Sequence, residues 1–342
     1  MSQKAPEHPA VPPPSLPTPL YRASEFGSAR VELWIKNDGV SHALYGGNKV
    51  RKMVRLVAEA KRRGARRVLT IGAAGSHHVL TTAIFCRAAG LRSAAAMFPQ
   101  PLTPHVLETF RATLGQGAEI YPTDRPSLVA LTAARAFRRG DYFVPPGGSN
   151  LIGTLGYVDA VSELAAQLVE LAVPAPDYIV VALGSGGSMG GIAAGVLAHG
   201  FDSRVVGVHV LGGAPLRAVT RRLAARALRV SGGRATRADL ERVLTFDTAE
   251  LGPGYGHATP QGIRASELAA QIGLTLDATY TAKAFSGALA LCRRLERAPE
   301  PGVKRVLYWH TLSAQPLEPL LAVAPSEAEL PDALRVLFTP KP

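Results

Sequence analysis

Apolar residues recur along this chain in two patterns that alternate. Short, nearly continuous apolar runs have the length of strands covered on both faces, and the stretches between them place apolar residues at helical spacing. The pattern predicts strands at 31–36, 67–71, 93–98, 118–121, 142–144, 178–183, 205–211 and 303–309. It predicts helices that begin at 50 and at 77, the second ending near 89, and further helices at 104–114, 127–138 and 153–171. Another helix follows the glycine-rich segment 184–191 and ends at 196, and the last four lie at 215–228, 238–244, 260–272 and 282–295. This alternation predicts an α/β fold in which crossover helices join parallel strands.

Length and composition favour a large globular protein. The chain has 342 residues, of which 47% are apolar and 19% are charged, so it is long enough for about two domains. The chain shows no apolar run near the ~20 residues that a membrane helix requires, and residues 1–19 are rich in proline without a signal-like apolar segment. We therefore expect a cytoplasmic protein. The two cysteines, Cys86 and Cys292, lie in apolar helical patterns, so we expect neither a disulfide nor a metal site.

The charge balance raises the possibility of nucleic-acid binding. The formal net charge is +12, and any strongly basic surface gains affinity for nucleic acid by counterion release. The arginines, however, are scattered over many predicted helices without interleaved aromatic residues or a recognised reading motif. We interpret the basic charge as compositional and expect no nucleic-acid partner.

A glycine-rich turn at 44–52 delivers one lysine to the start of a helix. Gly46 and Gly47 permit backbone angles that a side chain would disfavour, and helical spacing begins at Val50. Lys49 therefore lies at the positive end of a helix dipole, which disfavours its ammonium form and leaves the amine more nucleophilic. A lysine that forms a Schiff base needs this state. An ordinary loop before a basic surface helix is the alternative interpretation.

A second glycine-rich turn follows the strongest predicted strand. The segment 184–191 holds five glycines and two serines before a helix begins, so several backbone N–H groups surround the positive end of that helix. The segment lacks the Lys-Ser/Thr ending of a P-loop, and no acidic residue of a dinucleotide fold follows, so a phosphate monoester is favoured over ATP or NAD. A tight turn without a ligand is the alternative.

The segment Gly75-Ser76-His77-His78 also joins a predicted strand to a helix. A hydroxyl, two imidazoles and exposed helix-terminal amides can hold an anion or move protons. Consecutive helical residues point about 100° apart, so His77 and His78 should not act as a pair of metal ligands. Helix capping by Ser76 beside a buried histidine is the simpler alternative.

A reactive lysine, a phosphate-binding turn and a Ser/His anion loop together describe a pyridoxal phosphate pocket. At this point the chain resembles the family of D-cysteine desulfhydrases and 1-aminocyclopropane-1-carboxylate deaminases. The resemblance runs from about Pro17 to Pro316 and is carried by the stretches 46–52, 147–150 with Gly153 and Gly156-Tyr157, 184–187, 254–256, and Asp277 with 280–281 and 283–285.

The resemblance implies a fold type II pyridoxal phosphate enzyme, similar to the tryptophan synthase β subunit. Such enzymes have two open, mostly parallel twisted sheets with helices on both faces. Residues 1–49 and 161–342 would form a large cofactor-binding domain, and 50–160 a smaller inserted one. A homodimer is also implied.

The resemblance also assigns roles to residues. Lys49 would bind the cofactor covalently, and Ser76, Tyr255 and Tyr280 would be catalytic. The cofactor would contact Asn48, His77, Gly184, Ser185, Gly186, Gly187, Ser188 and Thr281. The substrate would contact Ser76, His77, His78, Tyr255 and Leu312.

Thr281 helps to choose between the two activities. It matches the position that faces the pyridine nitrogen, where the deaminases typically have Glu, and a threonine makes the ring a weaker electron sink. That favours a D-cysteine desulfhydrase-like lyase, which eliminates a β substituent from a small amino acid and gives a keto acid, ammonia and a thiol or sulfide. Deamination of 1-aminocyclopropane-1-carboxylate, β-replacement and racemisation are the alternatives.

Two departures from the family pattern affect the substrate assignment. His77 replaces an asparagine that normally bonds the cofactor's ring oxygen, and Leu312-Ser313 replaces Gly-Gly in the pocket wall. A cofactor-binding protein without turnover, and a basic interaction protein without a cofactor, are the rival classes.

Overall fold

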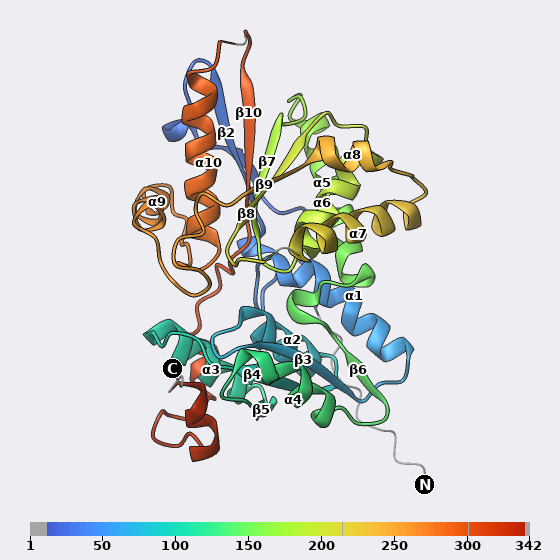
Figure 1. Ribbon diagram of the computed structural model, residues 1–342, viewed down its shortest axis with the longest axis vertical. Helices are drawn as coiled ribbons and strands as arrows, with labels where there is room; N and C mark the ends of the chain where they lie inside the picture. The colour runs from blue at the N-terminus through green and yellow to red at the C-terminus, as the bar shows by residue number, and fades with distance from the viewer. Residues whose placement is uncertain (1–11, 214, 300, 339–342) are drawn as a thin grey trace.

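Two β-sheets organise the chain, one above the other in Figure 1. The computed structural model describes residues 12–213, 215–299 and 301–338. The larger sheet has the order β1 (Leu20–Arg22), β2 (Val31–Asn37), β10 (Lys304–His310), β7 (Tyr178–Leu183), β8 (Arg204–His209) and β9 (Leu244–Asp247). The strands of this sheet are parallel except β1, which runs antiparallel to β2. The smaller sheet is fully parallel, with the order β5 (Glu119–Pro122), β4 (Arg92–Phe98), β3 (Arg67–Ala73) and β6 (Asp141–Phe143).

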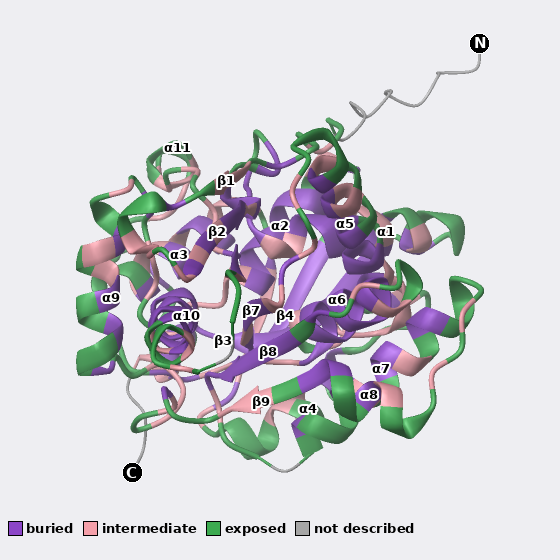
Figure 2. Ribbon diagram, turned by 90° about the horizontal axis from the view of Figure 1, so that it is seen from above, coloured by how far each residue is buried: buried purple, intermediate pink, exposed green. Residues whose placement is uncertain are grey.

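The larger sheet is covered by helices on both faces. Ile179, Val181 and Leu183 of β7 pack on one side with α5 (Leu151–Glu170), α6 (Gly187–Ala198), α7 (Pro215–Val230) and α8 (Arg237–Val243). Val180 points to the other side, toward α9 (Pro260–Ala270) and α10 (Thr281–Glu296). Because both faces of β7 are buried, its sequence is a continuous run of apolar residues and does not alternate between apolar and polar residues. Figure 2 shows the buried strands between helices whose outer faces are exposed.

The smaller sheet is covered in the same way. Its first face packs against α1 (Asn48–Arg62), α2 (His77–Ala88) and α3 (Pro104–Gly115). On the opposite face, Ile71 and Ala96 pack against Ala133 of α4 (Val129–Ala136). Short 3-10 helices lie at Ser24–Phe26, Asp38–Val40, Pro126–Leu128, Pro146–Gly148 and Asp332–Leu337. The predicted fold class is therefore confirmed, with two mostly parallel sheets and helices on both sides of each.

Residues 330–338, the last that the structure describes, return to the smaller sheet. After α11 (Glu318–Leu321), the side chains of Leu330, Leu334 and Leu337 pack against Val106 and Phe110 of α3. The predicted domain division assigns all of 161–342 to the domain of the larger sheet, whereas these contacts place the three leucines beside the smaller sheet. The contacts form because one face of α3 is apolar and is stabilised when it is buried away from water. The exact domain boundaries remain a prediction.

Two short strands were not predicted. β1 and β9 have only three and four residues, too few to show a strand periodicity. The predicted helix 238–244 ends one residue earlier than expected, because Leu244 begins β9. The first eleven residues of the proline-rich arm lie outside the described residues. In the described part of the chain, no helix is both long enough and apolar enough to span a membrane.

Candidate active site

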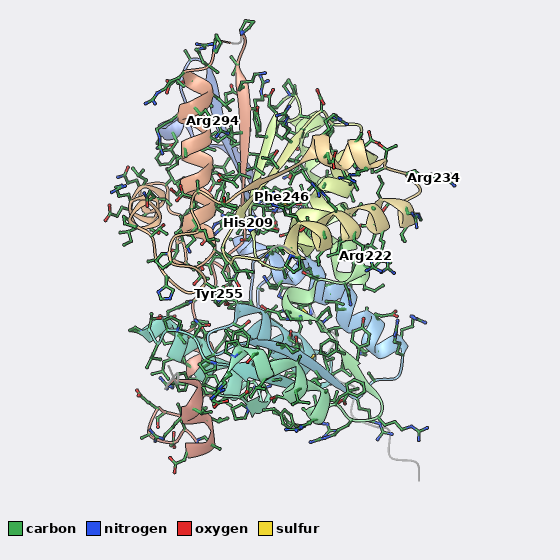
Figure 3. All side chains as sticks on the ribbon, viewed as in Figure 1. His209, Arg222, Arg234, Phe246, Tyr255 and Arg294 are labelled. Atoms are coloured by element: carbon green, nitrogen blue, oxygen red, sulfur yellow. The ribbon has the colours of Figure 1, made fainter. Side chains whose placement is uncertain are left out.

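A cavity of about 610 Å³ lies between the two sheets. Its walls include Ala73 at the end of β3, Leu183 at the end of β7 and Thr311 directly after β10. Open parallel sheets bind ligands beyond the carboxyl ends of their strands, and here the ends of both sheets face one cavity. Figure 3 shows Tyr255, another lining residue, between the two sheets.

Several helices begin at this cavity, among them α1, α2, α6 and α10. Lys49 of α1, His77 of α2, Ser188 of α6 and Thr281 of α10 each lie in the first turn of their helix and line the wall. The N-terminus of a helix carries partial positive charge and unpaired N–H groups. The cavity is therefore suited to a ligand with more than one anionic group.

The structure brings nearly all of the predicted site residues together around this cavity. Those that line it are Asn48, Lys49, Ser76, His77, His78, Gly184, Ser185, Gly186, Ser188, Tyr255, Tyr280, Thr281 and Leu312. Gly187 is buried just behind the wall, where its N–H donates to Oγ of Ser149 at 3.1 Å. The structure thus gathers these residues at one cavity, and their roles in catalysis and binding remain proposals.

The turn before α1 needs its two glycines for different reasons. Gly47 has a φ of +87°, and a Cβ there would meet the carbonyl oxygen of Thr311 at 2.7 Å. At Gly46 the limit is space, since a Cβ would lie 1.8 Å from the carbonyl oxygen of Gly39. The turn thus packs directly against two other backbone segments, which fixes the start of α1 and the position of Lys49.

Lys49 has the electrostatic state that a nucleophilic amine needs. Its Nζ donates to Oδ1 of Asn48 at 2.9 Å. Burial lowers the pKa of Lys49 to about 8, although the nearby carboxylate of Asp277 raises it. A substantial fraction of the side chain is therefore a neutral amine near pH 8.

Lys52 lies one helical turn after Lys49 and was not predicted as a site residue. Its Nζ donates to the carbonyl oxygen of Gly147 at 3.0 Å, and a Cβ on Gly187 would lie 2.9 Å from that Nζ. Burial, and then the charge of Lys49, lower the pKa of Lys52. The i, i+3 spacing of the two lysines was a signal for a shared face.

Lys52 lies beside the turn at 184–187, and Lys49 lines the same cavity. In the described residues, neither Lys49 nor Lys52 forms an ion pair with a carboxylate. Gly186 has a φ of +84° and leads into α6, and Oγ of Ser185 hydrogen-bonds Oγ of Ser149 at 2.7 Å. Buried cations require an anionic partner, so the site fits a phosphate group.

The Ser/His segment begins α2, and its two histidines point in different directions as predicted. Oγ of Ser76 caps the helix by accepting from the Val79 N–H at 3.4 Å. His78 Nε2 donates to Oγ1 of Thr70 at 2.8 Å, because the Thr70 hydroxyl proton is given to the carbonyl oxygen of Val144. Burial lowers the pKa of His78, so this imidazole is neutral.

His77 has both ring nitrogens occupied. Nδ1 lies 2.6 Å from the hydroxyl of Tyr45, and Nε2 lies 3.1 Å from Nε2 of His105. Burial lowers the pKa of His77 to about 4, with a smaller opposing effect of Asp277. A hydrogen bond from this ring to a bound cofactor would require one of the two existing bonds to break. Neither Tyr45 nor His105 was predicted as a functional residue.

The residues at the start of α10 form a compact polar group. Asp277 accepts hydrogen bonds from the N–H groups of Tyr280 and Thr281, at 2.8 and 3.0 Å. Oγ1 of Thr281 also donates to Oδ1 of Asp277 at 2.6 Å. The hydroxyl of Tyr280 donates to that of Tyr255 at 3.1 Å, which pairs the two tyrosines at the edge of the cavity. Asp277 was part of the recognised pattern but carried no predicted role.

Comparisons with known proteins agree with this geometry. The profile of the family described as pyridoxal-phosphate dependent enzymes matches residues 11–311. The D-cysteine desulfhydrase of Yersinia pestis (strain Pestoides F) is 32% identical over 287 residues, which is 80% of this chain and 84% of that protein. The D-cysteine desulfhydrase of Salmonella schwarzengrund (strain CVM19633) is 33% identical over 291 residues, covering 79% and 84%.

Solved structures give the same result. The crystal structure of a homologue of ACC (1-aminocyclopropane-1-carboxylate) deaminase has a TM-score of 0.75 and 28% identity, and the match covers 93% of this chain and 97% of that one. A fungal L-serine ammonia-lyase from Rhizomucor miehei has a TM-score of 0.64 at 17% identity, covering 90% and 96%, which supports the fold alone. The family profile covers most of the chain, and the two D-cysteine desulfhydrases pass 30% identity over most of their own length. The chain therefore belongs to the family of pyridoxal-phosphate dependent enzymes, and its cofactor is pyridoxal 5'-phosphate.

Proposed function

We propose that this enzyme is a lyase that eliminates the β substituent of a small amino acid, with D-cysteine as the first substrate to test. The products would be a keto acid, ammonia and a thiol or sulfide. The observation that carries the proposal is the gathering of Lys49, Ser76, Tyr255 and Tyr280 around one cavity. This occurs in a chain that shares about a third of its aligned residues with D-cysteine desulfhydrases.

The residues of the cavity fit the cofactor. The N-terminus of α6, the turn at 184–188 and Lys52 would hold the phosphate, because a dianion there supplies the counter-charge that the buried Lys52 lacks. Lys49, partly neutral near pH 8, would carry the cofactor through a covalent bond. When bound, pyridoxal phosphate supplies a conjugated ring that delocalises the electron pair left on the substrate's α carbon.

The remaining wall would bind and deprotonate the amino acid. The N-terminus of α2 presents Ser76 and positive helix-end charge to the cavity, which suits a substrate carboxylate. Lys49 or Ser76 would remove the proton from the α carbon. The paired hydroxyls of Tyr255 and Tyr280 would lie beside the substrate, and the side chain of Leu312 would limit its size.

Thr281 supports elimination over ring opening. Its hydroxyl already donates to Asp277, and a threonine at this position cannot hold a charge opposite the pyridine nitrogen. The weaker electron sink suits loss of a good leaving group from the β carbon. Deamination of 1-aminocyclopropane-1-carboxylate is the second candidate, favoured by the similarity to the deaminase homologue structure.

The visible absorption spectrum of the cofactor-loaded enzyme tests the proposal. We expect D-cysteine to shift the cofactor band, with sulfide and a keto acid released in equal amounts. L-Cysteine serves as the matched control for stereochemistry. Release of a keto acid from 1-aminocyclopropane-1-carboxylate, with no sulfide from either cysteine, would support the second candidate instead. A band that no amino acid shifts would contradict both.

We also propose that the enzyme is a cytoplasmic homodimer, as the family resemblance implies. Sedimentation velocity of the loaded enzyme would measure the assembly state. A single species with the mass of one chain would rule out the dimer.

A further inference from the structure

Three side chains from separate elements form one continuous hydrogen-bonded chain. Tyr45 lies in the turn before α1, His77 is the first residue of α2, and His105 is the second residue of α3. The Tyr45 hydroxyl is 2.6 Å from Nδ1 of His77, and Nε2 of His77 is 3.1 Å from Nε2 of His105. The rings of His77 and His105 lie 5.1 Å apart between centroids.

The two ends of this chain lie in different environments. Tyr45 is 2% exposed and lines the cavity together with Lys49, whereas the side chain of His105 is exposed to solvent. His77 is half-buried between them and also lines the cavity. The three residues therefore connect bulk water to the wall of the active-site cavity.

We propose that Tyr45, His77 and His105 form a proton relay between bulk water and the active-site cavity. The inference rests on the proposed function, because a relay is useful only where the reaction takes up or releases protons. Elimination does both, since a proton leaves the α carbon and the departing thiolate and amine take protons up.

The transfer balances in protons and involves no redox change. One proton from water binds Nδ1 of His105, and the proton on its Nε2 passes to Nε2 of His77. The proton on Nδ1 of His77 passes to the oxygen of Tyr45, whose original hydroxyl proton leaves to an acceptor in the cavity. Each step breaks one N–H or O–H bond and forms another. Reversal of all steps carries a proton outward.

A relay of this kind requires a neutral imidazole at His77, with one nitrogen donating and the other accepting. Burial lowers the pKa of His77 to about 4, and the charges of His105 on α3 and Lys49 on α1 lower it as well. Asp277, before α10, has the opposite effect and does not overcome them. The N-terminal position on α2 further disfavours an imidazolium. His77 therefore keeps a single ring proton across the physiological pH range.

Burial also raises the pKa of the Tyr45 hydroxyl, with a further contribution from Asp277. A free tyrosinate is thus disfavoured. Tyr45 can pass a proton only by receiving one as it gives one away, which is the behaviour of a relay member rather than of an independent base.

The first test replaces the solvent-exposed end. His105 does not line the cavity, so a His105→Asn variant should keep the cofactor band of the wild type. We expect kcat to fall about tenfold or more with little change in KM, and imidazole added to the buffer to restore much of the loss. His199→Asn, at an exposed histidine directly after α6, is the matched control and should be unaffected. An unchanged kcat in His105→Asn, or a loss that imidazole does not restore, would overturn the relay.

The second test does not depend on turnover. Enzyme labelled with ¹⁵N in histidine and loaded with cofactor should show a scalar coupling across the Nε2–H···Nε2 hydrogen bond of His77 and His105. The coupling should disappear in His105→Asn and persist in His199→Asn. Its absence from the wild type would overturn the relay whatever the enzyme catalyses. A wild type that shows the coupling but converts no cysteine would instead contradict the proposed function alone.

Discussion

Arg51 donates two hydrogen bonds to Asp38, from Nε at 3.0 Å and from Nη2 at 2.8 Å, only two residues after Lys49. Asp38 is fully buried and also accepts from the hydroxyl of Tyr157 at 2.8 Å and from Nε1 of Trp309 at 2.9 Å. One carboxylate therefore connects α1 with α5 and β10. This contact fixes the helix end that presents Lys49 to the cavity.

An Asp38→Asn substitution should destabilise the protein strongly. It would leave the buried guanidinium of Arg51 without its closest counter-charge, and breaking a buried ion pair typically costs about 3 to 5 kcal/mol. Urea unfolding of the loaded enzyme would measure the loss. Asp159→Asn is the matched control, because the Arg55–Asp159 pair has side chains 41% and 57% exposed and should contribute about 1 kcal/mol or less. Equal losses in the two variants would contradict this account.

Glu163 should make stability depend on acid pH. Burial alone would raise the pKa of Glu163, but hydrogen bonds and charge from Arg51 and Lys36 lower it from its ordinary 4.5 to about 2. Its stabilising effect is therefore complete above pH 4.5 and is lost as the pH falls toward 2. Between pH 5 and pH 3, about where a normal glutamate titrates, the unfolding free energy of the wild type should fall more steeply than that of Glu163→Gln. Parallel curves would show that Glu163 titrates normally.

Capture of the cofactor by the apoenzyme should speed up with rising pH. Only the neutral amine of Lys49 can form the covalent bond, and its pKa is lowered to about 8, so the neutral fraction rises through that pH and then levels off. Stopped-flow recording of the visible band after mixing with pyridoxal phosphate would measure the rate. Lys49→Ala should give no such band, whereas Lys61→Ala, at an exposed lysine of the same helix, should follow the wild type. A rate that does not change between pH 7 and 9, on either side of that pKa of about 8, would contradict the proposed state of Lys49.

A Thr281→Glu substitution tests the position opposite the ring nitrogen. The new carboxylate would lie beside Asp277 and would favour a protonated ring, so β-elimination should slow by about tenfold or more. Thr281→Ser keeps the hydroxyl that donates to Asp277 and should remain close to wild type. Steady-state kinetics with D-cysteine would compare the two variants. Unchanged kinetics in Thr281→Glu would show that this side chain does not face the ring nitrogen.

Local sequence patterns predicted those parts of the site that depend on neighbouring residues. The turns at Gly46-Gly47 and Gly184–Gly187 each lead into a helix, and both the glycines and the apolar periodicity that follows them are visible in a short stretch of sequence. The two-sheet architecture followed from the same alternation together with the family resemblance.

The parts that were missed depend on contacts between distant segments. His105 meets His77 only because α3 packs beside α2, and the Asp38 carboxylate meets Arg51, Tyr157 and Trp309 from three other elements. No spacing in the sequence relates these positions. β1 and β9 were missed because their pairing partners, rather than their own few residues, make them strands.

The return of the C-terminal leucines to α3 also bears on how the protein is made. Ribosomes release the chain from its N-terminus, so the smaller sheet and its helices emerge well before Leu330, Leu334 and Leu337. Until those leucines arrive, the apolar face of Phe110 and Val106 stays open to water and to other nascent chains. The smaller half of the enzyme therefore finishes folding only after Leu337 has been synthesised, and a premature stop codon after β10 would leave the strands around the cavity present but the protein prone to aggregate.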